Sequence, residues 1–188
     1  KMMQDPSVLE IADLPMVINS VTYPTLSETF RQIEERLLQA PGGMMVLEHG
    51  DVHYGNIFRS EKDGYQIIDP IIGGYNYPEA SINTTLIYPD LFVYDYDTQL
   101  DVGQERIKID YQTSEIYQRC EKTIKTLEPE LTGRLTEVQQ NTGYLNEFMF
   151  INLARSFVGL VNPMNLEKTQ QNRYAHLARA VERYYKSV

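Results

Sequence analysis

The sequence predicts a mostly helical α+β fold that carries a small β-hairpin. Apolar residues recur at helical spacing through much of the second half of the chain. Nearer the N-terminus, an Asp-Gly pair separates two short runs rich in β-forming residues, which is typical of a hairpin. Hydrophobic residues make up 42% of the 188 residues, enough to bury the core of one domain or of one large lobe of a bigger enzyme.

The first segment is expected to be irregular. Residues 1–24 contain Pro6, Pro15 and Pro24 and show little periodicity. Prolines spaced in this way interrupt helices and central strands. We therefore expect a linker over residues 1–24, followed by a single domain over residues 25–188.

A helix and a short strand should follow this linker. Thr25 and Glu28 have the spacing of a capping box, which marks the start of a helix. Four apolar residues then share one helical face, namely Phe30, Ile33, Leu37 and Leu38. Pro41 and two glycines end this pattern, and the apolar run at residues 44–47 predicts a buried strand.

The hairpin is predicted over residues 57–68. Residues 57–59 and 65–68 are rich in β-forming side chains and flank the sequence Glu-Lys-Asp-Gly. Antiparallel pairing would bring Asn56, at one open end of the hairpin, close to Asp69, at the other.

The rest of the chain should be helical after a region without regular structure. Residues 71–112 are rich in Gly, Pro, Tyr and Asp and show no clean period. Pro129 is expected to begin a separate helix, because proline suits the first helical turn. In all, we expect about five or six helices and few strands. Three apolar faces support the later helices: Ile116, Cys120, Ile124 and Leu127; Leu145, Phe148, Met149, Asn152 and Leu153; and Tyr174, Leu177, Val181, Tyr184 and Tyr185.

The functional hypothesis depends on Asp51, Asn56 and Asp69. They lie in the sequences His-Gly-Asp-Val-His-Tyr-Gly-Asn, at residues 49–56, and Ile-Ile-Asp-Pro, at residues 67–70. Phosphoryl transfer to an alcohol requires a hydroxyl aligned with the γ-phosphate and neutralisation of the developing charge. Asp51 can accept a hydrogen bond from that hydroxyl. The amide oxygen of Asn56 and the carboxylate of Asp69 are ligands that suit Mg²⁺.

At these residues the chain resembles the aminoglycoside phosphotransferase family, with its choline kinase and fructosamine kinase relatives. The shared pattern is H-G-D-x-H-x-x-N, then a hairpin, then I-D-P. The resemblance implies the helical C-terminal lobe of a protein-kinase-like fold, with the catalytic and metal loops on the hairpin. It also implies Asp51 as the catalytic aspartate, Asn56 and Asp69 as Mg²⁺ ligands, and ATP as the phosphate donor.

The two histidines of the motif are expected to order its loop. In this interpretation, His49 and His53 form hydrogen bonds that hold the loop shape. An alternative is that these histidines and Asp51 form the metal triad of a hydrolase. That alternative leaves Asn56 and Asp69 without a role, and the further histidine ligands of such sites are missing.

The acceptor should be a small molecule that carries a hydroxyl group. Aminoglycosides, amino alcohols and ketosamine-type sugars are the candidates that follow from the resemblance. Asp90, Asp95 and Asp97 lie among aromatic residues, which would suit a cationic acceptor, although a solvated acidic loop has the same composition. The formal net charge of −9 argues against nucleic acid or an anionic membrane as partner. Four other polar residues are expected to be solvated on helix surfaces, namely Glu137, Glu147, Glu182 and His176.

A cytoplasmic location is expected. Cys120 is the only cysteine, so the chain cannot form an internal disulfide bond, which fits a reducing compartment. No apolar run approaches the roughly 18 residues that a membrane span needs.

The part of the family that grips ATP has no counterpart in the sequence. Lys1 is the only lysine before His49, and no glycine-rich phosphate loop precedes the motif. We therefore expect a fragment that lacks the N-terminal lobe. The alternative is a truncated or degenerate lobe that acts as a binding module, but the presence of Asp51, Asn56 and Asp69 together favours descent from an active enzyme.

The 188-residue chain is predicted to bind Mg·ATP weakly or not at all. The reason is the absence of the lysine and the loop that would hold the phosphates. Isothermal titration calorimetry of the chain with Mg·ATP tests this prediction directly. Micromolar affinity would contradict it.

Overall fold

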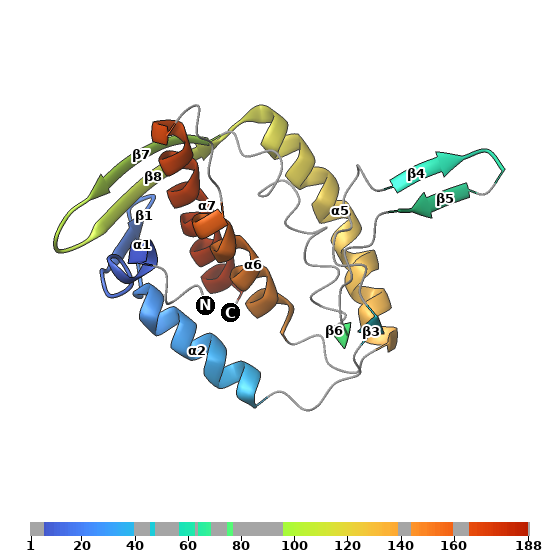
Figure 1. Ribbon diagram of the computed structural model, residues 1–188, viewed down its shortest axis with the longest axis horizontal. Coiled ribbons are helices and arrows are strands. Elements are labelled where there is room, and N and C mark those ends of the chain that lie inside the picture. The colour runs from blue at the N-terminus through green and yellow to red at the C-terminus, as the bar shows by residue number, and fades with distance from the viewer. Residues whose placement is uncertain are drawn as a thin grey trace.

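Residues 6–39, 46–47, 57–62, 64–68, 75–76, 96–138, 144–159 and 166–187 are described by a computed structural model. Within these ranges the chain is an α+β protein with five helices (Figure 1). The helices are α1 (Pro6–Leu9), α2 (Leu26–Leu38), α5 (Glu115–Val138), α6 (Leu145–Gly159) and α7 (Leu166–Ser187). The strands are β1 (Met16–Ile18), β2 (Val21–Tyr23), β3 (Val46–Leu47), β4 (Ile57–Ser60), β5 (Gly64–Ile67), β6 (Tyr75–Asn76), β7 (Tyr96–Val102) and β8 (Ile107–Thr113).

Four of the strands form a mixed sheet in the order β2-β1-β8-β7. Strand β1 is antiparallel to β2 and parallel to β8, whereas β7 and β8 form an antiparallel hairpin. Asn19 and Ser20 connect β1 to β2, and both have positive φ, as tight hairpin turns require. The side chain of Asn19 also accepts a hydrogen bond from the Tyr111 N–H at 3.0 Å, which fixes this turn against β8.

The β7–β8 hairpin corrects the expectation that residues 71–112 contain no regular element. Its sequence alternates between inward and outward side chains. Ile107, Ile109 and Tyr111 are buried, whereas Lys108 and Asp110 between them are partly exposed. This period of two is typical of a strand with one buried face.

The expectation of an irregular linker over residues 1–24 is wrong for the described part of that segment. Residues 6–24 contain α1, β1 and β2, and Val8, Met16 and Ile18 are buried in the core. The prolines lie at the boundaries of these elements, where a missing N–H does no harm. Pro15, for example, precedes β1, and its carbonyl accepts a hydrogen bond from the Ile107 N–H at 3.0 Å.

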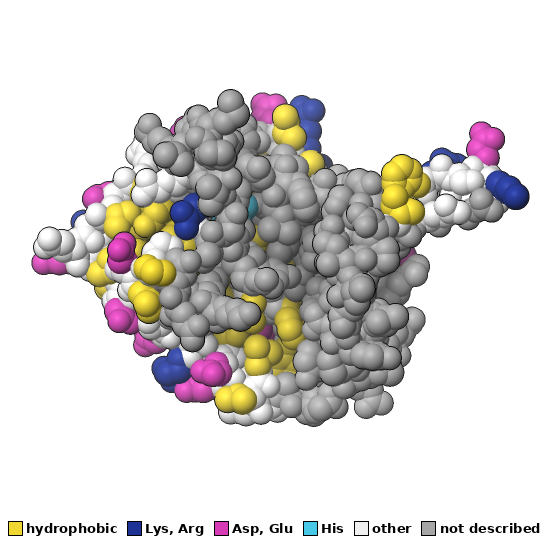
Figure 2. Space-filling model, viewed as in Figure 1, with side chains coloured by type: hydrophobic (Ala, Val, Ile, Leu, Met, Phe, Trp, Pro, Cys, Tyr) yellow, Lys and Arg dark blue, Asp and Glu magenta, His cyan; other side chains and the backbone are white. Residues whose placement is uncertain are grey.

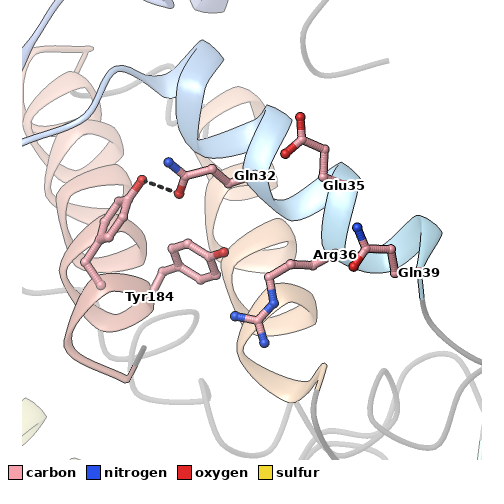
Figure 3. A pocket seen from close by; sticks show the side chains of 6 residues that line it. Gln32, Glu35, Arg36, Gln39 and Tyr184 are labelled. Carbon is pink, nitrogen blue, oxygen red and sulfur yellow. Dashed lines mark hydrogen bonds between the residues drawn. The ribbon is translucent and has the colours of Figure 1, made fainter.

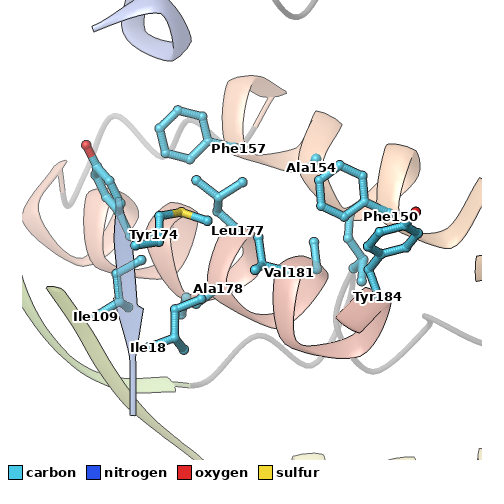
Figure 4. Packing of buried hydrophobic residues seen from close by; sticks show 14 of the residues in the cluster. Ile18, Ile109, Phe150, Ala154, Phe157, Tyr174, Leu177, Ala178, Val181 and Tyr184 are labelled. Carbon is cyan, nitrogen blue, oxygen red and sulfur yellow. The ribbon is translucent and has the colours of Figure 1, made fainter. Parts of the chain in front are cut away.

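Helix α7 lies at the centre of the core. It packs along α6 on one side and against β7 and β8 on another (Figure 1). In Figure 4, Leu177 and Val181 of α7 lie between the aromatic side chains of α6 and the isoleucines of the sheet. The apolar face predicted for this helix is confirmed at four of its five residues, since Tyr174, Leu177, Val181 and Tyr184 are buried, whereas Tyr185 is half-buried.

Helix α2 begins as the capping box predicts. The Glu28 N–H donates to Thr25 Oγ1 at 3.2 Å, and Ile33 faces the core. Leu38 is 79% exposed, so it lies outside the apolar face to which we assigned it. The rings of Phe30 and Phe150 meet edge to face with centroids 5.2 Å apart, which joins α2 to α6.

Helix α5 differs from expectation in two respects. It continues through Pro129, although an interior proline removes one backbone hydrogen bond and crowds the carbonyl four residues before it. Its buried face also differs, since Ile116 is 64% exposed whereas the adjacent Tyr117 is fully buried. A tyrosine that pairs its hydroxyl can be buried as readily as an aliphatic residue, and the phenol of Tyr117 accepts a hydrogen bond from Arg179.

The surface of the described residues is mixed in character. Figure 2 shows acidic and basic side chains interspersed on the described part of one face, with the β4–β5 hairpin projecting from the body. Among the described helices, none is both long enough and apolar enough to cross a bilayer.

Two isoleucines on α5 provide a matched test of its buried face. Ile124 is 4% exposed and Ile116 is 64% exposed, so the same substitution should have unequal effects. Ile124→Ala is expected to lower the free energy of unfolding by about 2–4 kcal/mol, because it leaves a cavity. Ile116→Ala should change it by no more than about 0.5 kcal/mol. Urea denaturation measures both, and equal losses would contradict the orientation of α5.

Candidate functional site

Most of the side chains predicted to form the phosphotransferase site lie outside the described residues. These are His49, Asp51, His53, Asn56, Asp69, Asp90 and Asp95. Asp97 is described, and it is exposed on β7. Among the described residues, no group of three or more His, Cys, Asp or Glu side chains is arranged to hold a metal ion. The structure instead describes the strands that enclose the motif in the sequence.

The hairpin predicted beside the motif is confirmed. Strands β4 and β5 pair antiparallel, with Ile57 opposite Ile67 and Ser60 opposite Gly64. At the turn, the Lys62 N–H donates to Ser60 Oγ at 3.1 Å, and Gly64 has a left-handed φ of 72°. The open end of the hairpin is the Ile57–Ile67 pair. The sequence position of Asn56 directly precedes this pair, and that of Asp69 follows two residues after it.

A second strand pair encloses the motif in the sequence. Strand β3 ends two residues before His49, and β6 begins six residues after Asp69. The two strands are antiparallel, with Leu47 opposite Tyr75. The apolar strand predicted over residues 44–47 is therefore confirmed for its second half. The motif sequence leaves from β3, passes through β4 and β5, and returns to β6 beside its starting point.

In the acidic and aromatic stretch that we considered for substrate binding, adjacent side chains of β7 differ in exposure. Asp97 is exposed, but Tyr96 beside it is fully buried, because the two side chains alternate along a strand. The ring of Tyr96 contacts the rings of Tyr111 and His176 edge to face, with centroids 5.9 and 5.4 Å away. Tyr96 therefore belongs to the core and is not available to a cationic acceptor.

Three polar residues expected to be solvated are buried. Glu147 and His176 are 0% exposed and Glu182 is 5% exposed. The side chain of Glu137 lies outside the part of α5 for which side chains are described. Residue type predicts exposure for all three, and the sequence offers one signal against it. Each has an apolar residue on at least one side, and a helix that is buried on several sides also buries its polar positions.

Glu147 forms an ion pair with Arg36 that joins α6 to α2. The Arg36 Nε lies 2.9 Å from Glu147 Oε1, although the described atoms give neither carboxylate oxygen an aligned hydrogen bond. Burial raises the pKa of the neighbouring Tyr184 phenol, the Glu147 carboxylate raises it further, and the Arg36 guanidinium lowers it. The charges of this cluster therefore balance within the protein.

A hollow of about 270 Å³ lies between α2 and α7 beside this ion pair. Figure 3 shows the side chains that line it, with Gln32 accepting a hydrogen bond from the hydroxyl of Tyr185. The hollow is lined by Gln32, Glu35, Arg36, Gln39, Tyr184 and Tyr185. Glu35 is itself paired with Arg31 at 2.7 Å, so its carboxylate is also balanced by a protein cation.

A second polar network, partly buried, connects β8, α5 and α7. The Tyr111 hydroxyl donates a hydrogen bond to buried Glu182, and Lys186 lies 3.2 Å from the same carboxylate. Arg179 pairs with Glu121 and donates to the Tyr117 hydroxyl at 3.1 Å. Burial raises the pKa of Tyr111 far above its usual value, and the nearby Arg179 guanidinium opposes this effect.

No protein-family model, curated protein or solved structure matches this chain.

Tyr111→Phe is predicted to lower stability at pH 7 by about 1–3 kcal/mol, because buried Glu182 loses a donor. The raised pKa also implies a pH dependence. The neutral phenol is favoured in the folded state, so its contribution is complete below the unfolded-state pKa of about 10 and is lost as pH rises above that value. Stability should therefore decline above about pH 10, and Tyr111→Phe should make this decline shallower.

Urea denaturation at pH 8 and pH 10.5, for the unmodified chain and for Tyr111→Phe, measures both effects. Tyr144→Phe is the matched control, because Tyr144 is half-buried in the turn directly before α6. An identical alkaline decline in the unmodified chain and in Tyr111→Phe would contradict the role of Tyr111.

Proposed function

We propose that this chain is the C-terminal lobe of a protein-kinase-like phosphotransferase that moves the γ-phosphate of ATP to a hydroxyl of a small molecule. The observation that supports the proposal is the antiparallel pairing of β4 with β5, because a hairpin was predicted at this place. In the sequence, one short motif ends directly before the Ile57–Ile67 pair and the other begins at that pair. The β3–β6 pair supports it by closing the same stretch of chain from the other side.

The pairing of β4 with β5 limits how far apart Asn56 and Asp69 can lie. Directly opposed residues in an antiparallel pair have Cα atoms about 5.5 Å apart at most, and consecutive Cα atoms are about 3.8 Å apart. Asn56 is one residue from Ile57, and Asp69 is two residues from Ile67. The Cα atoms of Asn56 and Asp69 are therefore at most about 17 Å apart, whatever path the chain takes. Without the hairpin, the twelve intervening residues would permit more than twice that separation.

The donor chemistry suits magnesium. An amide oxygen and a carboxylate oxygen are hard ligands, and Mg²⁺ commonly takes only one or two protein carboxylates together with water and phosphate oxygens. When bound, the ion would neutralise charge on the transferred phosphate. Asp51 would orient the acceptor hydroxyl and accept its proton, while His49 and His53 would order the loop through hydrogen bonds.

The four-stranded sheet contributes no residue to the proposed site. That sheet was not predicted, and its strands come from residues 16–23 and 96–113, on either side of the motif in the sequence. The expected helices after the hairpin are present as α5, α6 and α7. The described residues give little support for a cationic acceptor. Asp97 is exposed and able to meet a cationic molecule, but Tyr96 is not.

Asp51→Asn is predicted to reduce phosphate transfer by roughly 100-fold or more, because an amide cannot accept the hydroxyl proton. The measurement uses a protein that contains these 188 residues together with the segment that grips ATP. Labelled ATP is tested with aminoglycoside, amino alcohol and ketosamine acceptors. Asn56→Ala and Asp69→Asn should raise the Mg²⁺ concentration needed for half-maximal activity.

Glu105→Gln, in the exposed β7–β8 turn, is the control that should retain full activity. Turnover of Asp51→Asn close to that of this control would rule out the assignment of Asp51. Retained Mg·ATP binding without transfer to any acceptor would favour the non-catalytic binding module.

A further inference from the structure

Strand β7 is an outer strand of the four-stranded sheet. Among the described strands it pairs with β8 alone, and Figure 1 shows it at the margin of the sheet. It has seven residues and no proline. An edge strand of this kind carries unpaired main-chain groups, which are a template for pairing with another chain. The outer edge of β7 is therefore a candidate for strand addition.

The turn of the β7–β8 hairpin shows which groups of β7 point away from β8. The Gly103 N–H donates to the Arg106 carbonyl at 3.0 Å, so these two residues form a hydrogen-bonded pair. Hydrogen-bonded and non-hydrogen-bonded pairs alternate along an antiparallel ladder. The N–H and C=O of Asp101 therefore point toward β8, whereas those of Leu100 and Val102 point toward the outer edge.

The hydrogen bonds on the opposite side of β8 agree with this assignment. The Ile107 N–H donates to the carbonyl of the residue before β1, and the Ile109 carbonyl accepts from the N–H of the residue after β1, both at 3.0 Å. Ile107 and Ile109 thus turn main-chain groups away from β7. Since Ile107 lies opposite Val102 and Ile109 lies opposite Leu100, these two residues of β7 turn theirs away from β8.

The accessible part of this edge is short. Val102 is 44% exposed and Leu100 is half-buried, whereas Thr98, which has the same orientation, is 6% exposed. Within the part of the chain that the structure describes, no hydrogen bond leads from the main chain of Leu100 or Val102 to a residue outside the hairpin. A further strand could therefore form hydrogen bonds with both residues, along positions 99–102.

The two faces of this edge differ in chemistry. On the outer face, Asp97, Gln99 and Asp101 are exposed and bring two carboxylates without a cation. The one cation of β8, Lys108, lies 2.7 Å from Asp110 and is balanced by it. The other face is apolar at positions 100 and 102. Successive side chains of an added strand would therefore meet carboxylates and apolar groups in alternation.

A second copy of β7 suits this edge poorly. In the register that sets Leu100 opposite Val102 of the other copy, the two Asp101 residues lie opposite each other with Cα atoms about 4.5 Å apart. Like charges in that position destabilise an antiparallel pair. The formal net charge of −9 adds repulsion between whole chains. A strand with basic residues on the same face would gain attraction from the same carboxylates.

We propose, independently of the phosphotransferase function, that the outer edge of β7 binds an extended protein segment in which basic residues alternate with apolar ones. The main chain of the segment bonds to Leu100 and Val102. Its basic side chains lie beside Asp97 and Asp101, and its apolar side chains extend the face that Leu100 and Val102 begin. In strand addition of this kind, main-chain hydrogen bonds give affinity and alternate side chains give specificity.

The test uses the isotopically labelled 188-residue chain and three short capped peptides. One alternates lysine with valine, one alternates glutamate with valine, and one has the lysine and valine composition with its valines placed together. The alternating lysine peptide should bind with a Kd roughly fivefold or more below that of the rearranged peptide, because only alternation places its lysines together on the acidic face. The glutamate peptide should not bind. Fluorescence anisotropy measures all three affinities.

Amide hydrogen exchange locates the bound strand. Binding of the alternating lysine peptide should slow the exchange of the Leu100 and Val102 amides, whose N–H groups point to the outer edge. The Asp101 amide, which already points to β8, should change little. Attraction between charges without strand addition would slow none of the three.

Two substitutions separate the main-chain contribution from the charge contribution. Val102→Pro removes an outward N–H and should weaken binding roughly tenfold, whereas the matched control Val102→Thr keeps the donor and the branched side chain. Asp101→Lys should weaken binding of the lysine peptide roughly fivefold and allow the glutamate peptide to bind. Glu105→Lys makes the same change of charge in the exposed turn and should have little effect.

Equal affinity for the alternating and rearranged peptides would overturn the proposal, as would binding that leaves Leu100 and Val102 exchange unchanged. Sedimentation that shows a dimer with these same amides protected would assign the edge to a second copy, which also overturns it. Thermal midpoints report whether each variant is folded. If Val102→Pro lowers the midpoint, Asp101→Lys, at an exposed position, decides the outcome.

Discussion

The burial of α7 is the constraint on which the rest of this structure depends. A helix with α6 on one side and the β7–β8 sheet on another has few positions that can remain solvated. Its polar residues must therefore find partners inside the protein, because an unpaired buried charge is costly. Glu182 meets Tyr111 from the sheet, and Arg179 meets Glu121 and Tyr117 from α5. These contacts give α7 a fixed rotation and a fixed height against its neighbours, which apolar packing alone would specify less strictly.

The helices could be read from the sequence because their signals are local. A capping residue and a repeat near four residues are set within one or two turns, as Thr25 and the face of α7 illustrate. The buried face of α5 differs from the predicted one because the apolar pattern included Ile116 and left out Tyr117, which is buried with its hydroxyl paired. The sheet was missed for two other reasons. The alternation over Ile107–Thr113 was not recognised in a segment rich in Gly, Pro, Tyr and Asp, and strand β1, only three residues long, pairs with β8 far along the chain.

The candidate site shows the same division between local and distant information. The hairpin was predictable because Asp63 and Gly64 mark a turn between two β-forming runs, and the pairing follows from the turn. The pairing of β3 with β6 was not predictable, because each strand has only two residues. The buried state of Glu147 was equally hidden, since it depends on Arg36 of another helix. The chemistry of the side chains could be proposed from the sequence, whereas the β3–β6 pairing and the burial of Glu147 depend on contacts between distant segments.

The parallel pairing of β1 with β8 has a consequence for how the protein is made. The hydrogen bond from Tyr111 to the side chain of Asn19 joins residues 92 positions apart. All of the chain between them, including residues 49–70, belongs to a loop that this contact closes. Closing a long loop costs conformational entropy before the contacts that it brings together can offset that cost, and this slows folding. During synthesis, β1 cannot pair with β8 until Ile109 has been added to the chain, so the edge of β1 that faces β8 stays unpaired until then. The four-stranded sheet is therefore completed only after residues 49–70, which separate its two halves in the sequence, have been synthesised.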